Sequence, residues 1–347
     1  MPDPAKHDPA LPAADLPPSP VVPTIALTGD GKRHGHLRLP YSRDDSAWGS
    51  VMIPVSVIAN GPGPTALLIG GNHGDEYEGP VALWDLARSL TPDQITGRVI
   101  LLPALNQPAF ATAGRTSPID RGNLNRSFPG HPAGTVTQKI ADFVTRALLP
   151  EADIVLDIHS GGRTLDFLPF AAAHELPDPA HQARCVAAMR AFGAPFSMVM
   201  REIDAVGMLD TTAEAMGKTF VTTELGGGGT VTAASAGIAS RGIRGLLAHA
   251  GILPAPRPDP GPAPSRPLSM ADDRATHVAP ASGLCQPLRD LGERVAEGEP
   301  LALIHPADRL GAEPVTVRAQ MPGLLAGRHF PGLVKLGDFL AVIATEL

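Results

Sequence analysis

Short apolar runs alternate with segments of helical periodicity between residues 24 and 253 of this chain. The runs are rich in Val, Ile and Leu and are bounded by Gly, Pro or Asn, which predicts strands at 53–59, 65–69, 99–104, 154–159 and 220–224. Apolar residues spaced as on one helix face start at Val136, and others follow Pro80 at intervals of three from Val81 to Leu90. Weaker helical patterns cover 180–192 and 231–250. This alternation predicts an α/β domain, in which a sheet carries helices on both faces.

Two proline-rich stretches divide the chain. Residues 1–23 carry Pro at eight positions, too many for a helix or a central strand, which predicts an extended N-terminal arm. The stretch 254–267 predicts a stiff spacer between the α/β domain, 24–253, and a second domain, 268–347. The second domain contains a faint repeat, 282–304 and 322–343, in which Gly punctuates pairs of short strands. We therefore expect a small all-β barrel or sandwich there.

Composition excludes several classes of function. The chain has 347 residues with 28 Lys+Arg against 35 Asp+Glu, and only 4% of its residues are aromatic. Such a chain lacks the basic face and the stacking residues that nucleic-acid binding requires, so we expect no nucleic-acid partner. The N-terminus lacks the basic start and apolar run of a signal peptide, and no apolar stretch is long enough to span a membrane. We expect a cytoplasmic protein with no membrane partner.

Four of the predicted strands run directly into polar residues. The strand at 65–69 leads into Asn72, His73 and Glu76, and the next three lead into Asn106, His159 and Glu224. Ligands of open α/β sheets bind outside the carboxyl ends of the strands. Chance places one polar residue there easily, but not four, so we expect these side chains to line one crevice.

His73 and Glu76 have the chemistry of metal ligands. They lie three residues apart in a turn that Gly74 allows to tighten, and imidazole nitrogen and carboxylate oxygen both suit zinc. A lone HxxE is most often structural, so a third ligand is required, and His159 supplies it. The alternative for His159 is a core histidine bonded to a backbone carbonyl. Two His and one Glu leave a fourth position open, as in catalytic zinc sites, and Asp157 shares a face with His159 and can orient a ligand imidazole.

Glu224 is the candidate general base. It ends a buried strand, where an ionised carboxylate is costly unless it faces a cation or a cavity. The glycines at 226–229 that follow lack the Gly-Lys-Ser/Thr ending of a phosphate loop. We therefore interpret them as backbone that makes room for substrate.

An arginine-rich segment follows the third predicted strand. It contains Arg115, Arg121 and Arg126, and arginine beside a site can clamp a carboxylate or steady a developing oxyanion. The alternative is that an arginine here is solvated on the surface, and we keep this alternative for Arg121. The alternative is weaker for the pair Asn125-Arg126, because the pair stands just before the Phe128-Pro-Gly turn, in a segment expected to pack against the protein.

The ordered set HxxE, Asn-Arg, Asp-x-His and Thr-Glu-x-Gly resembles the succinylglutamate desuccinylase/aspartoacylase family, whose members are related to the zinc carboxypeptidases. The resemblance covers about residues 50–250, and the C-terminal β-domain common in the family fits 268–347. It implies a zinc-carboxypeptidase-like mixed sheet and one Zn²⁺ per chain. The implied ligands are His73, Glu76 and His159, with Glu224 as catalytic base and Asn125 and Arg126 as the clamp for a substrate carboxylate.

The resemblance also implies an arginine that polarises the scissile carbonyl. The family's compact Arg-x-x-Asp spacing is not kept here, since two extra residues separate Arg115 from Asp120 and Arg121 follows it. We assign the role to Arg115 and keep Arg121 open.

The implied substrate is a small N-acyl amino acid with a free α-carboxylate. Segments such as GGNHGDEYEGPVAL and TTELGGGGTV are most similar to the subgroup of the family that deacetylates N-α-acetyl-L-2,4-diaminobutyrate in ectoine breakdown. The ammonium of such a substrate needs an acidic partner, for which Asp166 and Asp204 are candidates. The alternatives are another deacylase of the family, a carboxypeptidase, and a non-catalytic zinc-binding protein. A homo-oligomer is also compatible with the sequence.

Overall fold

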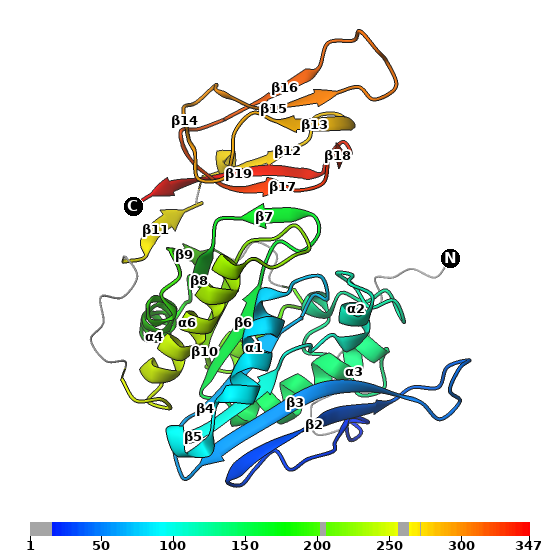
Figure 1. The fold of residues 1–347 in the computed structure, drawn as a ribbon, viewed down its shortest axis with the longest axis vertical. Coiled ribbons are helices and arrows are strands. Elements are labelled where there is room, and N and C mark those ends of the chain that lie inside the picture. The colour runs from blue at the N-terminus through cyan, green and yellow to red at the C-terminus, as the bar shows by residue number, and fades with distance from the viewer. Residues whose placement is uncertain (1–15, 202–205, 256–263, 271) are drawn as a thin grey trace.

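A computed structural model describes residues 16–201, 206–255, 264–270 and 272–347. A large mixed sheet runs through the described part of the molecule (Figure 1). Its first nine strands lie side by side in the order β1 (Val22–Pro23), β2 (Gly31–Pro40), β3 (Ser50–Asn60), β5 (Gly97–Leu102), β4 (Thr65–Gly70), β6 (Ile154–His159), β10 (Thr219–Glu224), β8 (Phe170–His174) and β9 (Phe196–Met200). All five predicted strands are confirmed, with boundaries within two or three residues of those expected.

The centre of the sheet is parallel. Strands β5, β4, β6 and β10 are parallel neighbours, and every residue of β4 and β6 is buried. Alternate residues of β4 face opposite cores: Leu68 packs on one side of the sheet, and Leu67 and Ile69 pack on the other. Burial on both faces explains why these strands appear in the sequence as unbroken apolar runs.

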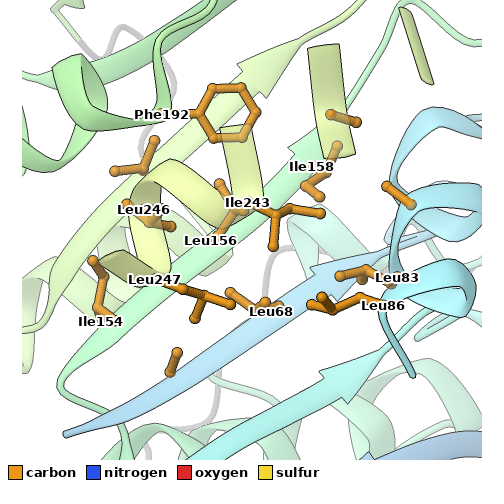
Figure 2. Close-up of a cluster of buried hydrophobic side chains, with 14 of the residues drawn as sticks. Leu68, Leu83, Leu86, Ile154, Leu156, Ile158, Phe192, Ile243, Leu246 and Leu247 are labelled. Atoms are coloured by element: carbon orange, nitrogen blue, oxygen red, sulfur yellow. The ribbon is translucent and has the colours of Figure 1, made fainter. Parts of the chain in front are cut away.

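Helices cover both faces, as expected. On one face lie α1 (Glu78–Ser89), α4 (Pro179–Phe192) and α6 (Ala233–His249), which pack on Leu68, Leu156 and Ile158 (Figure 2). On the other lie α3 (Val136–Phe143), its π-helical continuation η4 (Val144–Leu148), and α5 (Leu209–Ala215). The short α2 (Gln107–Ala111) follows β5. Figure 1 shows α1, α4 and α6 together on one side of the parallel strands.

One detail of the predicted helices is wrong. Helix α1 begins at Glu78, before Pro80, and its buried side chains include Ala82, Leu83 and Leu86. Val81 and Trp84, which the interval of three placed on the inner face, are 37% and 44% exposed. The buried stripe follows the i, i+3, i+4 spacing of an α-helix rather than a strict interval of three.

The strands of the described C-terminal part belong to two sheets. These strands are β11 (Arg266–Ser269), β12 (Thr276–Val278), β13 (Gly283–Pro287), β14 (Arg294–Val295), β15 (Pro300–His305), β16 (Val315–Arg318), β17 (Gly323–His329), β18 (Leu333–Val334) and β19 (Phe339–Glu346). One of the two is the main sheet, and the other is a separate sheet in the order β16-β15-β13-β18. Each copy of the repeat folds as strand, short strand, strand. The short strand of each copy pairs with the first strand of the other, β14 with β17 and β18 with β13, which interlocks the two copies.

The C-terminal strands continue the main sheet. Strand β11 pairs in parallel with β9 and antiparallel with β19, and β7 (Leu165–Phe167) pairs with β17 (Figure 1). Arg266 and Pro267, at the end of the predicted spacer, therefore belong to β11, whereas 256–263 lie outside the described residues. The division of the chain into domains at 254–267 stays a prediction. Most of the predicted N-terminal arm, 1–15, is also outside the described residues, and Val22–Pro23 at its end pairs with β2.

Two strands next to the expected ones were not predicted. β2 alternates polar and apolar residues only at its end, where Leu37 and Leu39 are buried, and β8 is a run of small residues that suits several structures. Among the described residues no helix is both long enough and apolar enough to cross a membrane.

Candidate active site

The polar residues predicted at the strand ends converge at one edge of the sheet. Strands β4, β6 and β10 are neighbours, with Gly70 opposite Ile158 and His159 opposite Glu224. The loop from β4 to α1 carries His73 and Glu76 over this edge. Gly74 is required in that loop, because a Cβ there would lie 2.1 Å from the carbonyl carbon of Ala109.

His73, Glu76 and His159 form a compact buried group. The Nδ1 atom of His73 lies 2.7 Å from one carboxylate oxygen of Glu76, and the Nδ1 atom of His159 lies 2.8 Å from the other. One potential ligand atom from each residue lies within 4.8 Å of the other two. Two imidazoles and a carboxylate in this arrangement match the donor set of a catalytic zinc site.

Polar partners orient both imidazoles. His159 Nε2 lies 2.8 Å from a carboxylate oxygen of Asp157, as the shared strand face predicted, and His73 Nε2 lies 3.2 Å from Oδ1 of Asn123. Asp157 also accepts a 2.8 Å hydrogen bond from the side-chain amide of Asn72. Because each Nε2 has an oxygen acceptor, each Nδ1 can turn its lone pair toward a cation.

Carboxylates and imidazoles in the group stabilise each other's charged forms. Burial opposes ionisation of Glu76, but the two histidines outweigh it and hold the pKa of Glu76 below its usual value. Burial likewise opposes charge on His159, yet Asp157 and Glu76 together raise the pKa of this imidazole well above its usual value. The site therefore favours a buried positive charge between these carboxylates.

Glu224 lies beside the group, opposite His159 in the sheet. Its Oε2 atom is buried and finds no hydrogen-bond partner among the described residues. Burial, followed by the charge of Glu76, raises the pKa of Glu224 to about 8. A carboxyl group poised near neutral pH beside a cavity is a candidate for proton transfer.

A cavity of about 250 Å³ joins the group to the predicted arginines. It is lined by His73, Glu76, Arg115, Asn125, Arg126, His159, Ser160, Gly161, Leu165, Phe167, Phe170, His174, Met200, Met208, Asp210, Thr222, Thr223, Glu224 and Met270. All seven predicted site residues line it. Met270 comes from the segment after β11, so the C-terminal region contributes to the wall.

Two of the three predicted arginines, Arg115 and Arg126, line the cavity. The Nη1 atom of Arg115 lies 3.4 Å from His73 Nδ1 and 3.7 Å from the carboxylate of Glu76. Arg126 lines the cavity next to Asn125, whose backbone carbonyl accepts a 2.7 Å hydrogen bond from Arg126 Nη1. Arg121 is exposed and is not part of the cavity wall.

Two sequence interpretations need correction. The glycines at 226–229 do not line the cavity; they make room for protein instead, since a Cβ on Gly227 would lie 1.9 Å from the carbonyl oxygen of Leu165. Asp166 is also outside the cavity wall, with its carboxylate 3.5 Å from Arg328 Nη2. Asp204 lies outside the described residues.

Several residues of the site carry no signal in the sequence. Asn123 acts through its hydrogen bond to His73, across 50 residues of chain. His174 lines the cavity and bonds through Nδ1 to a carboxylate oxygen of Glu214 at 2.9 Å.

By contrast, Asn72 and Asn106 were expected from their strand-end positions to line the crevice, but neither is part of the cavity wall. Asn72 donates a hydrogen bond to Asp157, and Asn106 donates one to the backbone carbonyl of Asn72. The strand ends were recognisable because their position follows from local pattern, and Arg115, Asn125 and Arg126 were found through the arginine-rich segment and the ordered motifs.

Comparison with known proteins agrees with this geometry. The model of the succinylglutamate desuccinylase/aspartoacylase catalytic domain matches residues 62–250, a range that holds all seven predicted site residues. The chain belongs to the succinylglutamate desuccinylase/aspartoacylase family. This confirms the family indicated by the ordered motifs.

Relatives of this family member align over nearly its whole length. An N-alpha-acetyl-L-2,4-diaminobutyric acid deacetylase of Halomonas elongata is 50% identical over 94% of this chain and 95% of its own. The product-bound structure of the ectoine utilization protein EutE (DoeB) from Ruegeria pomeroyi is 56% identical, with a TM-score of 0.92 over 95% of this chain and 100% of that one. A succinylglutamate desuccinylase structure from Silicibacter sp. is 55% identical, with a TM-score of 0.93 over 96% and 100% of the two chains. These likenesses confirm the mixed α/β fold with its C-terminal β region.

Proposed function

We propose that this protein is a zinc-dependent deacylase that hydrolyses the amide of N-α-acetyl-L-2,4-diaminobutyrate. Its relative from Halomonas elongata is named as a deacetylase of this compound. The observation that carries the proposal is the convergence of His73, Glu76 and His159 beside Glu224, whose buried Oε2 has no hydrogen-bond partner in the described part of the chain. The reaction releases acetate and 2,4-diaminobutyrate, a step that belongs to ectoine breakdown.

The three ligand candidates fit Zn²⁺. Both imidazoles have oxygen acceptors at Nε2, and both point Nδ1 toward the carboxylate of Glu76. When bound, zinc would polarise the acyl carbonyl and make water a stronger acid. One ion per chain, held by His73, Glu76 and His159, is the stoichiometry that this group supports.

Glu224 is the proposed general base. Its Oε2 atom is buried and accepts no hydrogen bond from any described residue, so that oxygen is available to take a proton from the attacking water. The same group then returns the proton to the amine as the amide bond breaks. A cation held by the neighbouring ligands would favour the ionised form of Glu224 that this role needs.

Arginine and asparagine complete the proposed machinery. Arg115, 3.7 Å from Glu76, is placed to stabilise the negative charge that develops on the acyl oxygen. Asn125 and Arg126 also line the cavity and are the proposed clamp for the α-carboxylate. A peptide presents the same α-carboxylate at its C-terminus, so a substrate screen has to separate the deacylase from a carboxypeptidase.

A substrate screen of the zinc-loaded enzyme tests the proposal. We expect N-acetyldiaminobutyrate to be hydrolysed with a higher kcat/KM than N-acetylaspartate, N-succinylglutamate or a peptide with a free C-terminus. A preference for another acyl amino acid would show that the proposed substrate is wrong and that the protein is still a deacylase. A preference for peptides would indicate a carboxypeptidase, and no hydrolysis of any amide would favour a non-catalytic zinc-binding protein.

A further inference from the structure

The cavity wall has acidic residues in two different settings. Among the described residues, its carboxylates are Glu76, Glu224 and Asp210. Glu76 bonds both histidines of the proposed metal group, and Glu224 lies beside them. Asp210 comes from a different element, the first turn of α5, and the proposed zinc chemistry gives it no role.

Asp210 is held next to the proposed carboxylate clamp. The backbone N–H of Leu209 donates a 3.0 Å hydrogen bond to Oδ1 of Asn125, and the N–H of Phe128 donates a 2.9 Å bond to the carbonyl of Gly207. These bonds fix the start of α5 against the segment that carries Arg126. The carboxylate of Asp210, which is 5% exposed, therefore shares a wall of the cavity with a guanidinium group.

Other acidic residues near the cavity have different surroundings. Glu214, one turn further along α5, accepts a bond from His174 Nδ1 and does not line the cavity. Asp166 pairs with Arg328, and Glu78 accepts a 3.0 Å hydrogen bond from Ser235 Oγ on α6. Neither of these two carboxylates belongs to the cavity wall.

We infer that Asp210 is the specificity-determining residue that receives the side-chain ammonium of the substrate. This inference rests on the proposed function. In N-acetyldiaminobutyrate the carboxylate and the ammonium are joined only through Cα and two methylene groups, so the groups that bind them must line one small cavity, as Arg126 and Asp210 do. A buried carboxylate binds an ammonium through a charge-assisted hydrogen bond, and it repels the acidic side chains of acetylaspartate and succinylglutamate.

The test compares two substrates of the same shape. N-acetylnorvaline replaces the ammonium of N-acetyldiaminobutyrate with a methyl group. For Asp210→Asn we expect the kcat/KM for the cationic substrate to fall about 10–100-fold, mainly through KM, because a charge-assisted bond is lost. Hydrolysis of N-acetylnorvaline should change less than about threefold. Asparagine can still accept the hydrogen bond that Asp210 Oδ1 receives from the N–H of Thr211, so the start of α5 is preserved.

Binding of the product provides a second measurement that does not need turnover. Calorimetry should show that Asp210→Asn weakens the binding of 2,4-diaminobutyrate but not of norvaline. Equal losses for both substrates and both products would show that Asp210 only supports α5, and would overturn the inference. So would a cation-selective loss in Asp166→Asn with none in Asp210→Asn.

The two proposals fail in different ways. If the unmodified enzyme hydrolyses N-acetylnorvaline better than N-acetyldiaminobutyrate, the deacylase stands and the role of Asp210 is wrong. If no acyl amino acid is hydrolysed, the proposed function fails, and the product-binding comparison still decides whether Asp210 selects an ammonium group.

Discussion

At the scale of single residues, the site depends on partners that hold the ligands as much as on the ligands themselves. Asp157 bonds His159 Nε2 and also receives the side-chain amide of Asn72, so it fixes the imidazole from behind. The outer partners of a ligand imidazole commonly change metal affinity by about 10–100-fold.

Asp157→Asn should therefore weaken zinc binding by about 10–100-fold without unfolding the protein. The amide cannot provide the negative charge that now faces His159 Nε2. Competition with a chromophoric chelator measures the affinity. Asp85→Asn serves as control, because Asp85 is exposed and forms an ion pair with Arg88 on the surface of α1. Equal zinc affinities in the two variants would contradict the orienting role of Asp157.

Glu224→Gln tests the proposed base. The amide keeps the size of the side chain but cannot take a proton, so we expect full zinc content and a kcat lower by about 10²–10⁴-fold. Turnover within tenfold of the unmodified enzyme would remove Glu224 from the reaction.

The same variant tests how the thermal stability of the zinc-free protein depends on pH. Burial raises the pKa of Glu224 to about 8 from 4.5, so the folded protein keeps a proton that the unfolded chain releases. Below pH 4.5 the group is protonated in both states and does not change the stability of the fold. As the pH rises from 4.5 toward 8, it lowers the stability of the fold progressively. Glu224→Gln should raise the Tm of the zinc-free protein at pH 8 and leave it nearly unchanged at pH 5. A Tm difference that does not vary with pH would contradict this assignment.

At the scale of elements, the glycine loop after β10 joins the catalytic strands to the C-terminal region. A Cβ on Gly228 would lie 2.7 Å from the ring of Phe330, and the N–H of Phe330 bonds the carbonyl of Thr164 beside β7. Strand β7 in turn pairs with β17. The loops at the edge of the site are thus packed against the C-terminal strands.

A matched pair of glycine substitutions measures this packing. Gly228 and Gly217 have nearly equal backbone angles, φ +72° and +73°, but a Cβ on Gly217 would meet nothing within 4 Å. Both alanine variants carry the same backbone strain, so the extra loss in Gly228→Ala reports the contact with Phe330. We expect that extra loss of unfolding free energy to be about 1–3 kcal/mol, together with reduced kcat. Equal losses in the two variants would show that the loop does not press on Phe330.

The elements differ in how far the sequence predicts them. The parallel strands were recognisable because burial on both faces leaves unbroken apolar runs, and their ends located His159 and Glu224. β2 was missed because only Leu37 and Leu39, at its end, are buried, which leaves no long apolar pattern in the sequence. Asn123 and Asp210 could not be assigned, since their roles arise only when the chain brings distant segments to one cavity. The glycines at 226–229 were misinterpreted because the sequence shows that something lies close to this backbone, but not whether it is substrate or protein. In the structure it is protein, Leu165 and Phe330.

At the scale of the whole molecule, one sheet links the parts that the proline-rich spacer was expected to separate. β11 lies between β9 and β19, with Leu268 buried in the joint. We expect thermal unfolding in a single cooperative transition, measured by calorimetry. Two resolved transitions would show that the C-terminal strands fold independently of the catalytic part.

A pair of leucines tests the joint directly. Leu268 is 1% exposed in β11, and Leu284 is 49% exposed in β13. Leu268→Ala should lower the unfolding free energy by about 2–5 kcal/mol, whereas Leu284→Ala should change it by about 0.5 kcal/mol or less. Chemical denaturation measures both values. Similar losses would mean that the joint contributes little to stability.

The most direct test of the whole account is a zinc titration of the metal-free enzyme, with hydrolysis of N-acetyldiaminobutyrate as the readout. Turnover should be absent without zinc, rise linearly and stop rising at one ion per chain, and His159→Ala should abolish both tight zinc binding and turnover. Undiminished hydrolysis in the metal-free protein, or tight zinc binding that survives loss of His159, would contradict a site built from His73, Glu76 and His159.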